Sequence, residues 1–449
     1  MTGTPVRHFW LSHPDAPPPD PPWRPLSDAL YWESPARAPD RRELFGHAPD
    51  WADDLQRVAR AVFAADRCTP RKAAFDHWTR HIRLSVPVVT PDAWSRALPH
   101  LTTLLGTVTG DRWEVEFRPF HADERPRARP LPFGPEEYAH EVALFSGGLD
   151  SLGWAARRAT ASDPGALLLI TLGERNFEPL QDAVYEAVRL RARRERFPRH
   201  LRRLVQSQSV RPKAAGAVPE LTTRSRGLLY AATAVHAAAA ERVPVVHVPE
   251  NGQLALNPPL SAARSGACST RSVHPWTLHH LNQIIEEVAG SSPSPVRVVN
   301  PFAGLTKGEV CAAARDAGLD QSVLEATLSC GAPPARRPPG GGRAARPRLN
   351  HCGLCFPCLV RRSGMLYAYG EDRTPYAADP WDPSLTPERT AHWRALQRWL
   401  DRPCTVLDLV ADTPLPPCAR PAELLAVVDR GRDELRALVA RAPGVRRSA

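Results

Sequence analysis

Residues 142–151 read Val-Ala-Leu-Phe-Ser-Gly-Gly-Leu-Asp-Ser, an apolar run followed by a glycine-rich turn. The four apolar residues predict a short buried strand, and a helix with apolar spacing begins directly after Ser151. Gly147 and Gly148 permit a tight turn that a ligand can approach closely. The hydroxyls of Ser146 and Ser151 lie beside the free amides of a helix N-terminus. This strand, turn and helix therefore predict a phosphate or pyrophosphate site.

Residues 139–370 alternate predicted strands with predicted helices. The strands are expected at 142–145, 166–171, 201–205, 243–248 and 296–299. The helices are expected at 152–158, 178–196, 226–241, 276–288 and 307–317. Such alternation predicts an α/β domain with a doubly wound parallel sheet and right-handed crossovers. Ligands of these sheets bind beyond the carboxyl ends of the strands, where the glycine-rich turn also lies.

The two flanking regions differ from the middle of the chain. For residues 1–138 we expect an α+β domain, joined to the middle domain by a proline-rich, charged linker at 124–135. Its main elements are expected to be a helix at 51–65, a strand at 81–89, a helix at 91–105 and a strand at 113–117. For residues 371–449 we expect a helical tail, because amphipathic stretches occupy 390–400 and 422–440.

Four cysteines form the second strong pattern. Cys352, Cys355 and Cys358 are spaced as C-x-x-C-x-x-C. Cys330 precedes them across a stretch rich in proline, glycine and arginine. Closely spaced thiolates with a distant fourth suit one tetrahedral Zn²⁺, which would also tie together the ends of that stretch. An iron-sulfur cluster is the alternative, and zinc is favoured because no redox partner motif occurs. His351 either replaces one cysteine or lies beside the site.

The net charge of +10 is weak evidence for a polyanionic partner, because 55 of the 58 basic residues are arginine. The densest basic run, residues 189–203, holds eight arginines in fifteen residues. A solvated helix face is favoured over an RNA-binding groove here, and nucleic acid binding stays open. Lysine occurs only at Lys72, Lys213 and Lys307, so a lysine within a motif indicates a need for its compact charge.

No segment indicates secretion or a membrane partner. The first twenty residues lack the apolar core of a signal peptide, and no run of 18 apolar residues occurs. We therefore expect a cytoplasmic protein. In a reducing compartment, nine cysteines favour metal binding or chemistry over disulfides.

The motif SGGLDS between a strand and a helix resembles the PP-loop of ATP pyrophosphatases, enzymes that cleave ATP to AMP and pyrophosphate. It is not the Walker loop, because no G-x-x-x-x-G-K-[ST] occurs. Residues 139–370 resemble the 7-cyano-7-deazaguanine synthases, and the chain most closely resembles the QueC-like proteins of the Qat anti-phage defence system. The further motifs that carry this resemblance are TRSR at 223–226, NPF to TKGE at 300–309, SC at 329–330 and CGLCFPCLVR at 352–361.

The resemblance implies an adenine nucleotide alpha hydrolase-like fold with ATP bound at the turn. The residues that would contact the nucleotide are Ser146, Gly147, Gly148, Leu149, Asp150, Ser151, Ser225 and Arg226. Catalysis would rest on Asp150, near which Mg²⁺ would bind, and on Lys307, which would neutralise charge on the phosphates. A surface role for Lys307 is disfavoured, because a cation is unfavourable at the start of a helix.

The acceptor half of the chain departs from the synthases. Phe356 and Pro357 replace the polar pair that is usual between the last two cysteines, and the synthases' Tyr-Pro-Asp-Cys-Arg segment is missing. Its region holds residues 269–275, Ser-Thr-Arg-Ser-Val-His-Pro. The ATP half of the resemblance therefore carries over, whereas the acceptor chemistry is left open.

Substrate residues are expected in the long loop after the strand at 243–248. They are Glu250, Asn257, Arg264, Thr270 and Arg271. Glu250 suits the N–H groups of a purine-like base. A guanidinium, from Arg264 or Arg271, would hold a substrate carboxylate in bidentate contact. Each of these residues alone is equally well explained as a loop cap or a surface charge.

The implied reaction is ATP-dependent activation of an acid of the 7-carboxy-7-deazaguanine type through an acyl-adenylate, followed by attack of an amine. In the family the amine is ammonia and the product goes on to a nitrile; here it could also be a protein of a defence operon. Two other hypotheses remain. One is an RNA-modifying PP-loop enzyme with salt-sensitive tRNA binding. The other is a nucleotide-binding subunit of a defence complex that signals without turnover.

Overall fold

A computed structural model describes the chain in segments. They are residues 4–12, 20–27, 31–33, 44–120, 134, 137–161, 165–173, 177–196, 198–206, 208–210, 218–221, 224–260, 271–292, 295–331, 335–336 and 348–442. Most of the expected linker at 124–135 lies outside these segments. The expected substrate residues Arg264 and Thr270 lie outside them as well.

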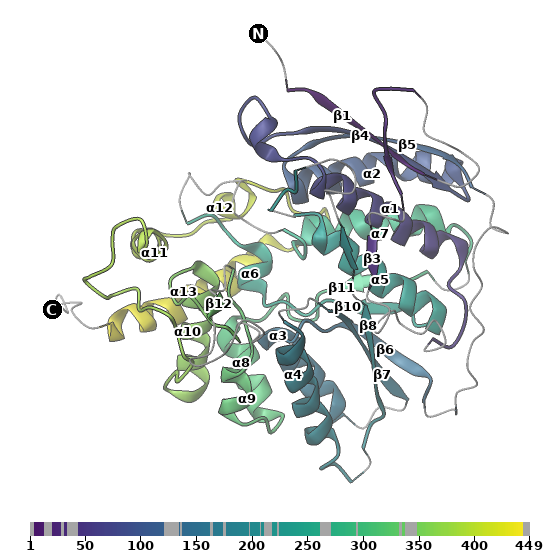
Figure 1. The fold of residues 1–449 in the computed structure, drawn as a ribbon. Coiled ribbons are helices and arrows are strands. Elements are labelled where there is room, and N and C mark those ends of the chain that lie inside the picture. The colour runs from purple at the N-terminus through teal and green to yellow at the C-terminus, as the bar shows by residue number, and fades with distance from the viewer. Residues whose placement is uncertain are drawn as a thin grey trace.

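A five-stranded sheet occupies the middle of the molecule (Figure 1), with strand order β11-β10-β6-β7-β8. Its strands are β6 (Ala139–Leu144), β7 (Ala166–Leu172), β8 (Leu201–Gln206), β10 (Val245–His247) and β11 (Arg297–Val299). All neighbouring pairs run parallel. The five strands lie where the alternation predicted them, so the prediction of a parallel α/β sheet is confirmed.

Helices cover both faces of this sheet. Their bounds are α3 (Leu149–Ala159), α4 (Glu178–Ala192), α5 (Arg226–Glu241), α7 (Pro275–Ala289) and α8 (Lys307–Asp316). On one face Ala143 and Leu169 pack with α3, α4 and α8. On the other face Val142 and Leu168 pack with α5 and α7. Successive strand residues point to opposite faces, and both faces are apolar, which is consistent with a doubly wound fold.

A second sheet, of four strands, lies in the N-terminal part, with order β2-β1-β4-β5. The elements are β1 (Val6–Leu11), β2 (Arg24–Leu26), α1 (Asp50–Arg67), the 3-10 helix η3 (Arg71–Ala73), β4 (His81–Val88), α2 (Pro91–Thr109) and β5 (Arg112–Pro119). All its neighbouring strands are parallel, which differs from the α+β arrangement we expected. The reason is the connection between β4 and β5, because a helix as long as α2 carries the chain back to start a parallel strand.

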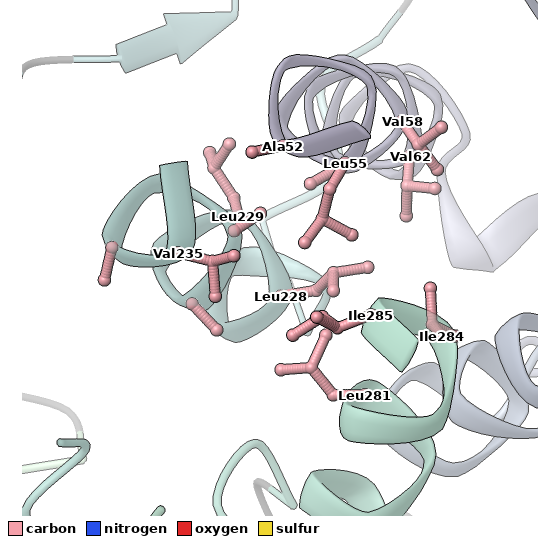
Figure 2. Packing of buried hydrophobic residues seen from close by; sticks show 14 of the residues in the cluster. Ala52, Leu55, Val58, Val62, Leu228, Leu229, Val235, Leu281, Ile284 and Ile285 are labelled. Carbon is pink, nitrogen blue, oxygen red and sulfur yellow. The ribbon is translucent and has the colours of Figure 1, made fainter. Parts of the chain in front are cut away.

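The two sheets sandwich a double layer of helices with one continuous apolar core. Figure 2 shows side chains of α1, α5 and α7 meeting in this layer. Those labelled are Ala52, Leu55, Val58, Val62, Leu228, Leu229, Val235, Leu281, Ile284 and Ile285. The expected boundary between residues 138 and 139 stays a prediction, and the residues on its two sides bury apolar surface against each other.

Helices also dominate the C-terminal part, as expected. Within residues 371–449 the bounds are α11 (Ala391–Asp401), α12 (Val406–Val410) and α13 (Pro421–Arg441). Three further helices precede them in the middle region, α6 (Gly252–Leu256), α9 (Gln321–Glu325) and α10 (Phe356–Tyr369). Helices α6, α10, α11 and α13 share a third apolar cluster. Two short antiparallel pairs complete the described elements, β3 (Tyr31–Glu33) with β9 (Gln208–Val210) and β12 (Ala335–Arg336) with β13 (Arg348–Leu349). No helix within the described segments is long and apolar enough to cross a bilayer.

Candidate functional site

The strand order creates a switch point between β6 and β10. From β6 the chain proceeds outward to β7 and β8, whereas β10 and β11 follow on the opposite side. In open α/β sheets, ligands bind at such a point, beyond the carboxyl ends of the strands. The SGGLDS turn follows β6, and Glu250 and Asn251 follow β10. The sheet therefore brings together two of the segments that the sequence singled out.

The turn after β6 is shaped by two glycines with different tasks. Gly147 has φ of 76°, a left-handed conformation that glycine adopts without strain. A β-carbon there would lie 3.1 Å from Cα of Gln181 on α4. Gly148 has φ of −80° and ψ of 168° and precedes the first residue of α3. Gly147 is therefore required by the backbone, whereas Gly148 leaves the entrance to the helix N-terminus without a side chain.

The hydroxyls of the turn fold back onto it. The Gly148 N–H donates to Oγ of Ser146 at 3.2 Å, and Oγ of Ser151 donates to the Gly148 carbonyl at 2.9 Å. The two hydroxyl oxygens are 3.3 Å apart. Ser146 is exposed, whereas the Leu149 side chain is buried in the core of the α3 face. Leu149 would thus contribute its backbone amide to an anion, together with the other free amides of the first turn.

A buried ion pair lies beside this turn. Nζ of Lys307, the first residue of α8, donates to Oδ2 of Asp150 on α3 at 2.7 Å. The Lys307 side chain is 2% exposed and that of Asp150 is 8% exposed. Oδ1 of Asp150 is buried and has no hydrogen-bond partner among the described residues. A buried carboxylate oxygen that no N–H group reaches is open to a further donor or to a bound cation, and the neighbouring Glu250 carboxyl is one such donor.

Glu250 joins this pair and completes a group of two carboxyls and one ammonium. Nδ2 of Asn251 donates to Oδ2 of Asp150 at 3.1 Å and to Oε1 of Glu250 at 2.9 Å. Burial and the Asp150 carboxylate raise the pKa of Glu250 well above its ordinary value. Burial also acts to raise the pKa of Asp150, but the Lys307 ammonium together with hydrogen bonds from Glu250, Lys307 and Asn251 outweighs it, and the net shift is downward. The site therefore favours the ionised form of Asp150 and the protonated form of Glu250, a combination that with the Lys307 ammonium is near neutrality.

Asn300 fixes the end of β10 against the end of β11. Its Oδ1 accepts from the backbone N–H of Glu250 at 3.2 Å and of Phe302 at 3.0 Å. Its Nδ2 donates to the Glu250 carbonyl at 2.7 Å. Asn251 in turn caps α6, because its Oδ1 accepts from the Leu254 N–H at 3.0 Å. The sequence pointed to the motif that begins with Asn300, but it gave no signal for the roles of Asn251 and Asn300.

The four cysteines gather into one cluster, as predicted. The sulfur atoms of four residues all lie within 4.8 Å of one another: Cys330, Cys352, Cys355 and Cys358. The Cys330 and Cys355 sulfurs are 3.9 Å apart, and those of Cys352 and Cys358 are 3.8 Å apart. Four thiolates at Zn–S distances of about 2.3 Å would have tetrahedral S–S separations of about 3.8 Å. The group can hold a metal ion such as Zn²⁺.

Backbone amides support these sulfurs. The N–H groups of Leu354 and Cys355 donate to the Cys352 sulfur at 3.4 and 3.3 Å, and that of Cys352 donates to the Cys330 sulfur at 3.4 Å. His351 points elsewhere, since its Nε2 accepts from the Ser329 N–H at 3.1 Å. Of the two roles considered for His351, the place beside the site fits this geometry.

The cysteine cluster is tied to the phosphate turn through residues 324–330. A β-carbon on Gly148 would lie 3.5 Å from the Leu328 carbonyl oxygen, two residues before Cys330. Arg361 of α10, fully buried, donates to the Leu324 carbonyl at 2.6 Å and to Oγ1 of Thr327 at 2.9 Å. A metal in the cluster would therefore stiffen one wall of the candidate site.

Other expected site residues have partners within the chain. Ser225 is buried, and its Oγ donates to Oδ2 of Asp66 at 2.5 Å. Arg226 lies over the Tyr230 ring at 5.7 Å. Arg271 forms a buried ion pair with Asp412 at 3.1 Å, and Asn257 ends α6 with φ of 42°. The contacts just described do not involve Asp150 or Lys307, so the predicted roles of these four residues in binding stay predictions.

The arginine-rich run is largely neutralised by neighbouring carboxylates. Its members Arg189, Arg191, Arg199, Arg202 and Arg203 form ion pairs with Glu186, Glu195, Glu141, Glu241 and Asp182. These five are among the eight arginines of the run. Guanidinium groups held this way are less available for phosphate contacts. Only Arg189 and Arg191 of these five lie on α4, whereas Arg199, Arg202 and Arg203 precede or lie in β8 and are largely buried. The run is therefore not one solvated helix face, and nucleic acid binding stays a prediction.

No protein-family model matches the chain, and no match was found among the curated proteins. The resemblance to the synthases thus rests on the motifs quoted above. The structure adds that two of them, SGGLDS and the segment that begins with Asn300, meet at the switch point of a parallel sheet.

Proposed function

We propose that the protein is an AMP-forming ATP pyrophosphatase that activates a carboxylate for attack by an amine. The observation that carries this proposal is the Lys307–Asp150 pair at 2.7 Å, buried beside a side-chain-free helix N-terminus at the switch point of the sheet. A helix N-terminus favours phosphate oxygens, and an ammonium held beside it favours the charge that develops on pyrophosphate. The ATP phosphates would lie against residues 146–151.

The donor set around Asp150 fits Mg²⁺. The orphaned Oδ1 of Asp150 and the adjacent Glu250 carboxyl are oxygen ligands of the kind this ion takes, with phosphate oxygens and water completing its coordination. When bound, Mg²⁺ would neutralise charge on the phosphates. Its double charge would also favour release of the Glu250 proton. We therefore assign Glu250 to the phosphate side of the site in preference to the base contact expected from the sequence.

The proposed reaction has two steps. An oxygen of the substrate carboxylate attacks the α-phosphorus, the bond to the bridging oxygen breaks, and pyrophosphate leaves. An amine nitrogen then attacks the acyl carbon, loses a proton and displaces AMP. Lys307 would stabilise the departing pyrophosphate, and the free amides of α3 would orient the phosphates for in-line attack. The synthase resemblance suggests 7-carboxy-7-deazaguanine as the acid and an anti-phage context, with ammonia or a protein amine as acceptor.

The proposed four-thiolate Zn²⁺ site would serve structure. Four cysteine ligands leave no open position for substrate. Their contribution would be to hold residues 324–330 against the phosphate turn.

The test is incubation with ATP, Mg²⁺ and 7-carboxy-7-deazaguanine, with AMP and pyrophosphate measured together. We expect both products in equal amounts, dependent on the acid, and lost in Asp150→Asn and Lys307→Met variants. AMP formation that requires tRNA would instead support the RNA-modifying alternative. ATP binding without AMP formation would support the non-turnover subunit.

A further inference from the structure

The C-terminal helix α13 reaches the start of α8, where Lys307 lies. Glu434 of α13 accepts a hydrogen bond from the Gly308 N–H at 3.0 Å through Oε2 and one from the Thr306 hydroxyl through Oε1. The side chain is buried. Its two partners are the residues on either side of Lys307. The carboxyl therefore holds in place the backbone from which the lysine side chain extends.

The packing around this contact leaves Lys307 little freedom. A β-carbon on Gly308 would lie 2.5 Å from Oε1 of Glu434, and one on Gly364 of α10 would lie 2.8 Å from Cγ of Lys307. Arg430, one turn before Glu434, pairs with Glu309 of α8 at 2.6 Å. Helices α10 and α13 thus enclose the lysine from two sides, and two glycines permit the close approach.

The Glu434 carboxyl also affects the electrostatics at the start of α8. Lys307 places its cation at the positive end of the α8 dipole, where a cation is unfavourable. A carboxylate hydrogen-bonded to the free amide of Gly308 offsets this field. Thr306 and Glu309 already form a capping box on α8, so the helix does not need Glu434 merely to begin.

We propose that Glu434 is a positioning residue for Lys307, which makes the C-terminal helix a functional part of the phosphate site. This inference rests on the proposed role of Lys307 toward pyrophosphate. It goes beyond that role because it assigns a task to a region that carries none of the recognised motifs. Glu434 itself touches no substrate and acts through the backbone of residues 306–308.

The experiment measures pyrophosphate binding by calorimetry with the full-length, zinc-loaded protein at pH 8. Glu434→Gln should weaken binding about tenfold while the zinc content stays that of the wild type and the melting temperature does not fall. The matched control is Glu423→Gln on the same helix, where the glutamate is exposed and pairs only locally with Arg420. Gly308→Ala should weaken pyrophosphate binding as Glu434→Gln does, because its new methyl group would displace the Glu434 carboxyl.

A double-variant cycle with Lys307→Met separates positioning from general stabilisation. If Glu434 acts through Lys307, Glu434→Gln should have no further effect on binding once the lysine is removed. Equal, additive losses in the presence and absence of Lys307 would overturn the inference. So would wild-type affinity in both Glu434→Gln and Gly308→Ala. A wild-type protein that binds neither pyrophosphate nor ATP would overturn the proposed function and this inference together.

Discussion

Removal of the Lys307 ammonium should destabilise the fold by an amount that grows with pH. Lys307→Met keeps the length of the side chain along Gly364 but leaves the Asp150 carboxylate buried without its cation. Breaking a buried pair by removing one partner costs about 3–5 kcal/mol. Without the lysine, burial would raise the Asp150 pKa above its value in the unfolded chain, because burial is the largest single influence on this carboxyl. The penalty should therefore be small below that unfolded pKa and develop as pH rises through the folded one.

Urea unfolding at pH 5 and pH 8, with excess zinc held constant, measures this effect. We expect the full penalty at pH 8 and less than half of it at pH 5. The double variant Lys307→Met with Asp150→Asn should recover most of the loss, because it removes the buried charge and leaves an amide that can still bond Asn251. Equal penalties at both pH values, or additive losses in the double variant, would refute the view that Lys307 chiefly neutralises Asp150.

Three further predictions address other features. Cys355→Ser should give insoluble or zinc-free protein, whereas the wild type should bind about one zinc by elemental analysis, since such sites contribute folding free energy. Gly147→Ala should lower the free energy of unfolding by about 1–2 kcal/mol, because residue 147 has a positive φ. Gly148→Ala should fold normally but lose ATP affinity. A destabilised Gly148→Ala and a Gly147→Ala of normal stability would contradict the assigned turn. Burial raises the pKa of Glu434 to about 7. This carboxyl thus favours folding below the unfolded pKa of 4.5, and its contribution fades as pH rises through 7. Between pH 4 and pH 8, the free energy of unfolding of the wild type should therefore fall by about 3 kcal/mol relative to that of Glu434→Gln. Unfolding measured at each pH checks this difference.

The local elements and the metal cluster were predictable because short-range patterns encode them. Apolar runs fixed the five central strands, and the expected helix at 226–241 has those bounds in the structure. The cysteine spacing alone predicted the four-thiolate group. The all-parallel N-terminal sheet was missed, although the long helix between β4 and β5 was a cue for it.

The partners of charged residues were not predictable, because they lie far apart in the chain. Arg264 or Arg271 was expected to hold a substrate carboxylate; the ion pair of Arg271 with Asp412 had no signal in the sequence, and the substrate role stays a prediction. Glu250 was expected at a base and lies with Asp150. Glu434 had no local signal at all, and more than a hundred residues separate it from Thr306. A sequence shows that a charge exists, but only the packing decides whether its counterpart is a ligand or the chain itself.

Two buried ionic groups in this molecule show why one is a candidate site and the other is not. In the N-terminal part, each guanidinium nitrogen of Arg80 donates a hydrogen bond, to Asp66, Thr69 or Asp111. The Arg80 guanidinium is therefore fully hydrogen-bonded within the chain and has no donor left for a ligand. The group around Asp150 retains a carboxylate oxygen that no N–H group reaches and a Glu250 carboxyl whose pKa is raised well above its ordinary value, beside a helix N-terminus without a capping side chain. Buried charge that the chain leaves incompletely satisfied costs stability. Because such cost is expected where function requires it, the incomplete group is the one to test first.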